Sequence, residues 1–288
     1  MIGIFDSGYG GLTILQQIRS VLPKYDFLYL GDNARAPYGT RSFDCIYRYT
    51  LEAVHYLFDQ GCTLIILACN TASAKALRTI QQHDLPMINA QIVNRKCVNV
   101  LGVIRPTVEA VPAITRTGHV GVLATPATVS SESYVLELDK LTALTHLGQS
   151  VPSPLTITQQ PCPMWVPLIE AGEHLSDGAD YFVDKYLREI LSRDPLIDTL
   201  VLGCTHYPLL LPKIEQWLSA NAQTVHCLPQ GKLVADSLAD YLRRHPEYET
   251  QLTLGGSCRY LTTDDAARFE QAATLFLGQP IHAEHVEY

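Results

Sequence analysis

The chain has 288 residues, of which 47% are hydrophobic and 17% charged, and its net charge is −8. This length suits one large domain or two smaller ones, and the lysines and arginines form no basic cluster of the kind that binds nucleic acid. No secretory signal precedes the first apolar run, and no apolar run approaches the ~18 residues of a membrane span. The sequence therefore predicts a cytoplasmic protein with reduced cysteines and with no membrane or nucleic-acid partner.

Apolar runs of strand length alternate along the chain with segments of helical periodicity. The first elements are a strand at 2–5, a Gly-rich turn at 8–11 and a helix over 12–22. The next predicted elements, in chain order, are a strand at 27–30, a helix from 42, a strand at 64–68, a helix at 72–83, strands at 120–124 and 199–202, a helix after 208, a strand at 224–228, a helix at 233–244, a strand at 259–261, a helix at 264–277 and a strand at 281–286. Such alternation is typical of an α/β fold with mainly parallel sheets.

Two pairs of segments resemble each other and indicate an internal duplication. Residues 64–71 read Leu-Ile-Ile-Leu-Ala-Cys-Asn-Thr, and residues 199–206 read Thr-Leu-Val-Leu-Gly-Cys-Thr-His. Residues 2–7 and 120–125 match in the same manner. We therefore expect two pseudo-symmetric α/β domains.

The weakly periodic stretch between 85 and 101 favours a crossing into the second domain, and we expect the chain to return just after His206. The predicted first domain covers 1–97 and is completed by 208–288, and the second covers 98–207.

Polar residues follow directly after four of the predicted strands. They lie at 6–7, 31–32, 69–71 and 204–206. Ligands of open α/β sheets bind outside the carboxyl ends of the strands. If the two domains face each other, these ends converge on one cleft, with Cys69 on one wall and Cys204 on the other.

Two thiols on opposite walls suit the removal and replacement of the α-proton of an amino acid. That proton is a weak acid, and a thiolate can act as the base because surroundings can lower the pKa of a cysteine. A thiol on the opposite face can return a proton, which inverts the configuration. Asp6 and His206 are candidates to assist the two cysteines. Hydroxyl and amide groups for binding the substrate are available on Ser7, Asn70, Thr71, Thr125 and Thr205.

Plainer interpretations stay open for several residues. Asp6 could cap the helix that follows it, Asp32 and Arg35 could form a structural ion pair, and Tyr38 could simply pack in the core. The turn at 8–11 matches no phosphate-binding motif, and no group of His and Cys has the spacing of metal ligands. The other cysteines are expected to be small apolar core residues: Cys45, Cys62, Cys97, Cys162, Cys227 and Cys258.

These motifs resemble those of the glutamate racemases, in the aspartate/glutamate racemase superfamily. The similarity covers 3–12, 31–39, 68–73, 124–129 and 203–209 in the order of the family, and extends more loosely to 259–265 and 276–278. The two cysteine motifs are highly specific when they occur together, whereas either alone is a weak signal.

The resemblance implies an enzyme without cofactor or metal that interconverts L- and D-glutamate and supplies D-glutamate for peptidoglycan. It implies two α/β domains with the site between them, a homodimer, and Cys69 and Cys204 as the acid/base residues. Carried over by position, the expected substrate contacts are Asp6, Ser7, Tyr38, Gly39, Asn70, Thr71, Thr125, Thr205 and His206.

Two rival hypotheses keep the same motifs but change the function. The substrate could be another small acidic amino acid such as aspartate, since the sequence does not define the depth of the cleft. Alternatively, the chain could bind a dicarboxylic amino acid without turnover. The presence of both cysteines argues against a binding protein.

Overall fold

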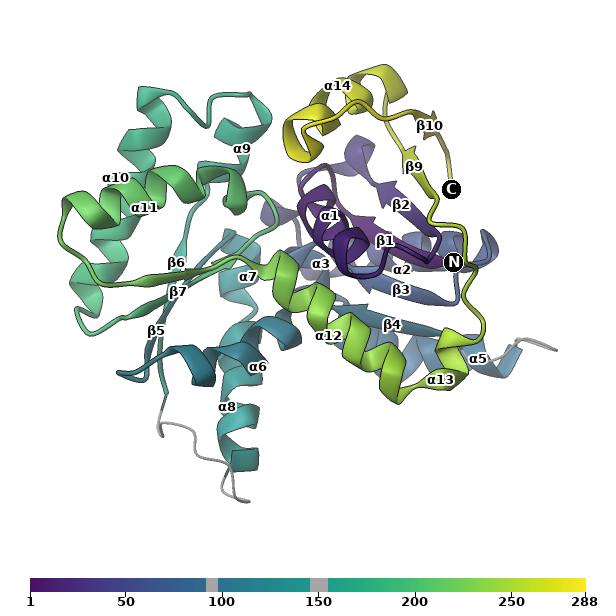
Figure 1. Ribbon diagram of the computed structural model, residues 1–288, viewed down its shortest axis with the longest axis horizontal. Coiled ribbons are helices and arrows are strands. Elements are labelled where there is room, and N and C mark those ends of the chain that lie inside the picture. The colour runs from purple at the N-terminus through teal and green to yellow at the C-terminus, as the bar shows by residue number, and fades with distance from the viewer. Residues whose placement is uncertain (92–97, 146–154) are drawn as a thin grey trace. The chain divides into compact units, whose positions relative to one another are not determined.

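The computed structural model describes residues 1–91, 98–145 and 155–288 (Figure 1). Residues 92–97, which include Cys97 and part of the predicted crossing, lie outside the described residues. The chain forms two compact units: unit 1 comprises Met1–Val103 and Gly231–Tyr288, and unit 2 comprises Ile104–Gln230. Each unit is built of helices and one parallel sheet, which confirms the predicted fold class.

Unit 1 contains a six-stranded parallel sheet in the order β10-β9-β2-β1-β3-β4. Its strands are β1 (Ile2–Asp6), β2 (Phe27–Gly31), β3 (Leu64–Leu67), β4 (Asn99–Gly102), β9 (Cys258–Thr262) and β10 (Ala283–His285). Every residue of β1, β2 and β3 is buried, as expected for central parallel strands with helices on both faces. Because β4 pairs with β3, unit 1 extends to Val103 instead of ending at the predicted residue 97.

The helices of unit 1 include all those predicted, with one of them divided, and four short elements that were not predicted. The full set is α1 (Gly11–Val21), η1 (Asn33–Arg35), η2 (Tyr38–Thr40), α2 (Phe43–Asp59), α3 (Asn70–Lys75), α4 (Leu77–Thr79), η3 (Ile80–Asp84), α5 (Leu85–Gln91), α12 (Gln230–Arg244), α13 (Pro246–Glu249) and α14 (Ala266–Leu277). The four that were not predicted are η1, η2, α5 and α13. The single helix predicted at 72–83 is instead divided into α3, α4 and η3. The division occurs at Ala76, whose φ of −114° departs from the helical value of roughly −63°.

Unit 2 contains a four-stranded parallel sheet in the order β6-β5-β7-β8. Its strands are β5 (His119–Ala124), β6 (Thr156–Pro161), β7 (Thr199–Gly203) and β8 (His226–Leu228). Residues 208–230 belong to this unit and not to the first domain, where the sequence placed them. The physical reason is that β8 pairs with β7, so the chain leaves unit 2 only after that strand.

The helices of unit 2 are α6 (Ile104–Ile114), α7 (Pro126–Ser130), α8 (Ser133–Thr145), α9 (Trp165–Glu170), α10 (Asp177–Arg193), η4 (Tyr207–Leu210) and α11 (Leu211–Ala220). The elements of unit 2 that were not predicted from the sequence are β6 and the helices α6, α7, α8, α9 and α10. β6 reads Thr-Ile-Thr-Gln-Gln-Pro and has only one buried residue, because it is an edge strand. It therefore lacks the apolar run by which the central strands are recognised.

The two sheets share one arrangement of strands, which supports the duplication inferred from the sequence. The order β2-β1-β3-β4 in unit 1 is the counterpart of β6-β5-β7-β8 in unit 2. The register agrees as well, since Ile2 pairs with Leu64 in unit 1 and Val120 pairs with Thr199 in unit 2. In both sheets the chain reverses its direction of winding at the pair of central strands, β1 with β3 and β5 with β7. Ligands of doubly wound sheets bind at this point.

Asp198, just before β7, joins that strand to the loop at 115–117 in unit 2. Its carboxylate accepts hydrogen bonds from the Thr115 hydroxyl at 2.7 Å and from the backbone N–H groups of Arg116 at 2.6 Å and Thr117 at 2.9 Å. Burial alone would raise the pKa of Asp198, but these hydrogen bonds and one from Thr199 lower it to about 2. The carboxylate therefore stabilises the folded protein as long as it stays ionised.

Asp198→Asn is expected to lower the free energy of unfolding by about 1 kcal/mol at neutral pH, a value discounted for partial exposure. The folded pKa is depressed from the ordinary 3.8 to about 2, so this stabilisation is present above pH 3.8 and is lost as the pH falls toward 2. Urea unfolding of both proteins should show the difference shrinking over that interval. Asp236→Asn, at a side chain 52% exposed, is the control; an equal loss there would contradict a specific role for Asp198.

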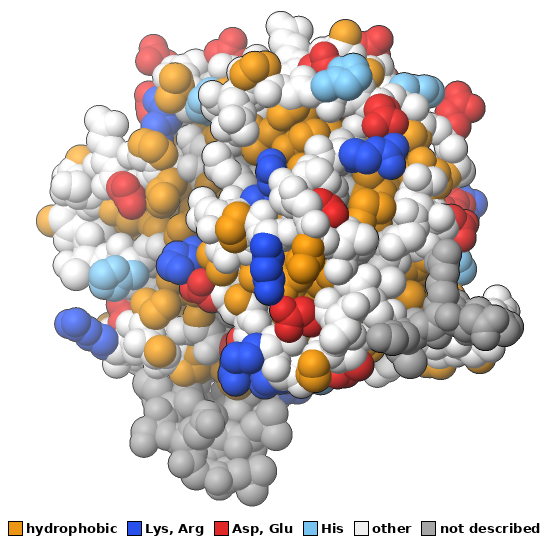
Figure 2. Space-filling model, turned by 45° about the vertical axis from the view of Figure 1, so that its right-hand side comes forward, with side chains coloured by type: hydrophobic (Ala, Val, Ile, Leu, Met, Phe, Trp, Pro, Cys, Tyr) orange, Lys and Arg blue, Asp and Glu red, His pale blue; other side chains and the backbone are white. Residues whose placement is uncertain are grey.

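The surface shows no concentration of positive charge on the face seen in Figure 2. Lysine and arginine side chains are scattered there among acidic ones. Among the described residues, none of the helices is long and apolar enough to cross a membrane.

Candidate active site

Cys69 lies just beyond the carboxyl end of β3, with Ala68 between them, and caps the N-terminus of α3. Its Sγ accepts a hydrogen bond from the backbone N–H of Ala72 at 3.4 Å, and the Ser7 hydroxyl lies 3.4 Å from the same sulfur. The thiol is buried, with 6% of the residue exposed. Because Ser7 follows β1 and Cys69 follows β3, the two residues meet where the winding of the sheet changes direction.

Asp6 and the Gly-rich turn form the other side of this site in unit 1. Asp6 is buried at the end of β1, and its Oδ1 accepts the N–H of Gly8 at 3.0 Å. It does not cap α1, because the N-cap of that helix is Gly10 and no side chain caps it. Gly11 must be glycine at this point, since a Cβ there would lie 2.5 Å from the Cβ of Asp6.

Aromatic residues pack against the turn that carries Ser7 and stabilise it. The hydroxyl of the buried Tyr29 donates to the Gly8 carbonyl at 2.9 Å. Tyr9 stacks on Phe269 of α14, with ring centroids 5.4 Å apart. The turn is therefore fixed by packing as well as by its own hydrogen bonds.

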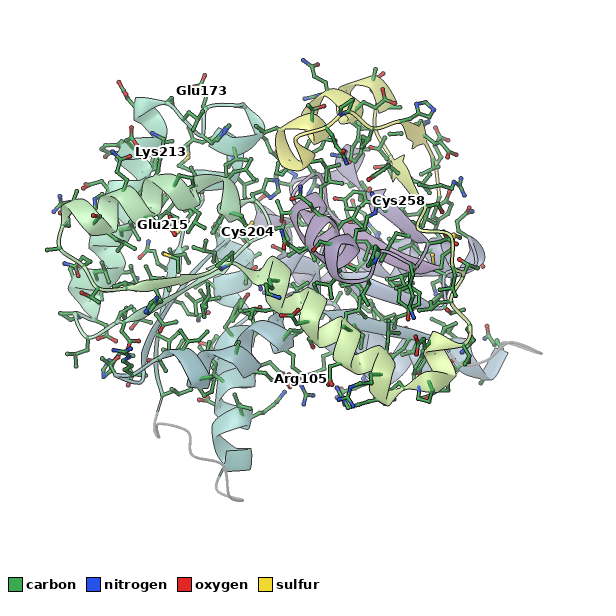
Figure 3. All side chains as sticks on the ribbon, in the orientation of Figure 1. Arg105, Glu173, Cys204, Lys213, Glu215 and Cys258 are labelled. Carbon is green, nitrogen blue, oxygen red and sulfur yellow. The ribbon has the colours of Figure 1, made fainter. Side chains whose placement is uncertain are left out.

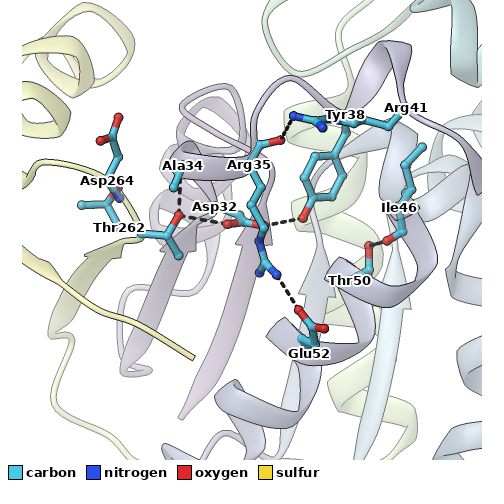
Figure 4. A network of polar contacts seen from close by, with 11 residues as sticks. Asp32, Ala34, Arg35, Tyr38, Arg41, Ile46, Thr50, Glu52, Thr262 and Asp264 are labelled. Carbon is cyan, nitrogen blue, oxygen red and sulfur yellow. Dashed lines mark hydrogen bonds and ion pairs between the residues drawn. The ribbon is translucent and has the colours of Figure 1, made fainter. Parts of the chain in front are cut away.

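A polar network centred on Asp32 supports the loop that follows β2 (Figure 4). The fully buried Asp32 carboxylate accepts from Arg35 Nε at 2.7 Å, from the Tyr38 hydroxyl and from the Thr263 hydroxyl at 2.9 Å. Arg35 also forms an ion pair with Glu52. The structural interpretation of Asp32 and Arg35 is thus confirmed.

Tyr38 is buried, and its hydroxyl is engaged by Asp32. Burial and the neighbouring Asp32 carboxylate raise the pKa of Tyr38 far above its ordinary value, so the phenol stays protonated. The side chain therefore belongs to the network that shapes the loop. A ligand at this position would therefore contact the backbone groups of Tyr38 and Gly39, which lie in η2.

Asn70 and Thr71 begin α3 immediately after Cys69 and are both buried. Their side chains share the carboxyl end of β3 with the thiol. In unit 1 the structure thus gathers five of the expected site residues around one pair of strands: Asp6, Ser7, Cys69, Asn70 and Thr71.

Cys204 occupies the equivalent place in unit 2, directly beyond β7 (Figure 3). Its Sγ lies 3.8 Å from Nδ1 of His206, and Nε2 of that histidine lies 3.0 Å from Oε1 of Glu170. Burial alone would lower the pKa of His206, but hydrogen bonds and negative charge from Cys204 and Glu170 raise it to about 10. At neutral pH the imidazole is therefore protonated between a sulfur and a carboxylate.

Thr125 and Thr205 lie beside this second thiol. Thr125 follows β5 and caps α7, with its hydroxyl accepting from the Thr128 N–H at 3.3 Å. β5 and β7 pair at Ala124 and Gly203, so Thr125 and Cys204 are the next residues on neighbouring strands. Thr205 is buried directly after Cys204.

Glu170 is a site residue that the sequence analysis missed. It ends α9, 34 positions before Cys204, in a segment with no motif. A lone glutamate at a helix end gives no local signal, and only the packing of α9 against η4 brings it to His206.

Of the other described cysteines, Cys62 and Cys162 are buried as predicted, whereas Cys45, Cys227 and Cys258 are only partly buried. Cys45, Cys62, Cys162, Cys227 and Cys258 are all free thiols. Burial raises the pKa of Cys62 to about 12 and of Cys227 to about 12, which keeps both protonated. In the part of the chain that the structure describes, no group of three or more His, Cys, Asp or Glu side chains is arranged to hold a metal ion.

Comparison with known proteins identifies the family that these motifs indicated. The profile of the Asp/Glu/Hydantoin racemase family matches residues 12–228. A glutamate racemase from Ruegeria sp. (strain TM1040) is 40% identical over 293 residues, which cover 98% of this chain and 98% of that protein. The crystal structure of a glutamate racemase isoform from Bacillus anthracis matches with a TM-score of 0.83 and 30% identity, over 100% of this chain and 97% of that chain.

A second solved structure is similar and carries a ligand. Glutamate racemase from Francisella tularensis, in complex with D-glutamate, matches with a TM-score of 0.80 and 32% identity, over 99% of this chain and 97% of that chain. The profile covers more than half of the chain, and the relatives match it over nearly its full length. These findings confirm the resemblance inferred from the sequence, and the chain belongs to the Asp/Glu/Hydantoin racemase family.

Proposed function

We propose that this chain interconverts L- and D-glutamate without a cofactor, with Cys69 and Cys204 as the two acid/base residues. The observation that carries the proposal is the equivalence of the thiols. Each follows the same central strand of its sheet, β3 or β7, in the same register with the neighbouring strand. The function is supported by relatives that are glutamate racemases at about 40% identity over nearly the whole chain.

In this reaction one cysteine is a thiolate and the other a thiol when the substrate binds. The thiolate takes the α-proton from one face of glutamate, and its electron pair closes the new S–H bond. The C–H electron pair stays on the substrate as a carbanion stabilised by the adjacent carboxylate. The opposite thiol then protonates the α-carbon from the other face and becomes the thiolate. Positioned acid and base groups each contribute roughly 10²–10⁴-fold to such steps.

The polar neighbours of each thiol suit this exchange of protonation states. His206 is an imidazolium beside Cys204, and Glu170 keeps it charged, so a positively charged donor faces the Cys204 sulfur. The Cys69 sulfur instead accepts a hydrogen bond from the Ala72 N–H and lies within hydrogen-bond distance of the Ser7 hydroxyl. Opposite charge and donated hydrogen bonds both favour the ionised form of an acid.

Substrate binding is proposed to use the polar groups next to the thiols. Glutamate presents two carboxylates and one ammonium group. Hydroxyls, amide groups and backbone N–H groups can hold the carboxylates, and the Asp6 carboxylate can accept from the ammonium. The proposed contacts are Asp6, Ser7, Asn70, Thr71, Thr125, Thr205, His206 and the backbone of Tyr38 and Gly39.

We further propose that the enzyme works in the cytoplasm as a homodimer and that its D-glutamate is used for peptidoglycan. The support is the family resemblance of the sequence. Sedimentation velocity of the purified protein tests the dimer directly, and a single species with the mass of one chain would contradict it.

The function is tested by incubating the reduced protein with D-glutamate or L-glutamate in D₂O without cofactor. Optical activity should disappear while deuterium enters the α-position, and neither chelators nor carbonyl reagents should slow the reaction. Exchange without loss of optical activity would mean that only one cysteine acts. If glutamate is inert, aspartate is tested in the same way, and inactivity with both would favour a binding protein.

Gly11→Ala is expected to lower kcat/KM for glutamate by about 10-fold or more, because displacement of a site group by an ångström is costly. The new Cβ would lie 2.5 Å from the Cβ and 3.0 Å from the Cγ of Asp6, so Asp6 must move. Initial rates with each enantiomer measure the effect. Gly178→Ala is the control, since its nearest neighbouring atom would lie 3.4 Å away, and equal losses in the two variants would rule out a specific effect on Asp6.

A further inference from the structure

A buried polar cluster in unit 2 joins three residues that the mechanism does not use. Nε2 of Gln230 donates to the hydroxyl oxygens of Thr107 and Tyr134, both at 2.8 Å. Gln230 is 2% exposed, and the other two residues are fully buried. Burying a polar amide costs free energy unless it is hydrogen-bonded. The cluster is therefore a specific arrangement that fixes these three side chains relative to one another.

Tyr134 connects this cluster to the Cys204 motif. A Cβ on Gly203, the residue before Cys204, would lie 3.2 Å from Cε2 of Tyr134 and 3.1 Å from the Leu123 carbonyl oxygen. The ring thus packs closely against the backbone at the end of β7, where an added Cβ would make tight contacts. Burial and then the negative charge of Cys204 raise the pKa of Tyr134.

Gln230 and Thr107 lie next to the two passages of the chain between the units, which are the crossings at 103–104 and 230–231. Unit 2 begins at Ile104, so Thr107 lies in the first turn of α6, and unit 2 ends at Gln230, the first residue of α12. The next residue, Gly231, already packs in unit 1, where an added Cβ would lie 2.7 Å from Cγ of Gln17. One hydrogen bond therefore links the two passages, and the same amide holds Tyr134.

We propose that Tyr134 and Gln230 are positioning residues for Cys204. Tyr134 supports the backbone that presents the thiol, and Gln230 fixes Tyr134 and anchors it to the two passages of the chain. The hydrogen-bond contacts described for Cys69 are instead with Ser7 and Ala72, both in unit 1. The inference rests on the proposed racemase function and adds residues that set the efficiency of one of its two proton transfers.

Slower proton transfer at Cys204 can be distinguished from a general loss of stability by isotope effects. The two enantiomers have equal free energies in water, so any variant must lower kcat/KM equally in the two directions. If only transfer at Cys204 is slowed, however, that step becomes more rate-limiting. One α-deuterated enantiomer transfers its deuteron to Cys204, and for it the primary isotope effect on kcat/KM then rises. The other transfers its deuteron to Cys69, and for it the isotope effect falls.

The test measures these isotope effects in Tyr134→Phe and Gln230→Met. Both variants are expected to lower kcat/KM by about 10-fold and to make the two isotope effects unequal. The difference between the two isotope effects should have the same sign as in His206→Asn, which removes the imidazole next to Cys204. If Tyr134→Phe fails to fold, Gln230→Met, whose side chain is similar in length, decides the question.

Matched controls in the same unit are Tyr186→Phe and Gln160→Met. Both residues are buried, and their polar groups bond to Met164 and to Glu189 instead of to the cluster. Their isotope effects should stay as in the wild type. Balanced isotope effects in Tyr134→Phe and Gln230→Met, or an inequality opposite to that of His206→Asn, would overturn the proposal. A wild-type protein that does not racemise glutamate would instead overturn the proposed function itself.

Discussion

Serine in place of either Cys69 or Cys204 is expected to lower kcat for glutamate racemisation by at least about 10³-fold. A hydroxyl is a far weaker acid than a thiol, so at neutral pH serine supplies almost no base. Each cysteine acts as base in one direction and as acid in the other. Both directions should therefore fail in each variant, and circular dichroism starting from D- or L-glutamate measures this directly.

Two further cysteines offer matched controls for that experiment. Cys45 in unit 1 and Cys227 in unit 2 are partly exposed free thiols outside the site. Cys45→Ser and Cys227→Ser should keep rates close to the wild type, since substitutions away from special features usually change stability by within about 0.5 kcal/mol. A rate near the wild type in Cys69→Ser or Cys204→Ser would show that the two-base assignment is wrong.

His206→Asn is expected to lower kcat/KM by about 10²-fold while leaving both cysteines in place. The imidazolium lies between Cys204 and Glu170, and asparagine carries no charge at any pH. Because the loss concerns one thiol, the isotope effects for the two α-deuterated enantiomers should become unequal. Asp6→Asn, on the Cys69 side, should make them unequal in the opposite direction. Balanced isotope effects in His206→Asn would contradict its pairing with Cys204.

The same histidine gives a prediction for stability against pH. Its pKa in the folded protein is raised from the ordinary 6.5 to about 10, so folding favours the charged form. This stabilisation is fully present below pH 6.5 and is lost as the pH rises through about 10. In urea unfolding, the advantage of the wild type over His206→Asn should therefore shrink between about pH 6 and about pH 10. An advantage that grows over this interval would reverse the assigned sign.

The central strands and their polar ends could be predicted from the sequence because both signals are local. A strand buried on both faces is a continuous apolar run, and β1, β3, β5 and β7 each have such a run. The residue after each run is then placed at the carboxyl edge of the sheet.

The elements that were missed have weaker local patterns. β6 is a polar edge strand, and β4 has one buried residue among its four. Because β4 and the pairing of β8 with β7 were not predicted, both points at which the chain crosses between the units were placed too early in the sequence. An edge strand is defined by its neighbour in the sheet, which a short segment of sequence does not reveal.

The sequence by itself determined the fold class, the internal duplication and the positions of Cys69 and Cys204, because apolar periodicity and strand ends are properties of short segments. Only the tertiary structure decided which distant side chains support each thiol. Glu170 reaches His206 from α9, and Gln230 joins Tyr134 to Thr107. These hydrogen bonds depend on how whole helices pack around the sheet. These pairs are 36 to 123 positions apart in the chain, and no local sequence pattern predicts that they will be hydrogen-bonded.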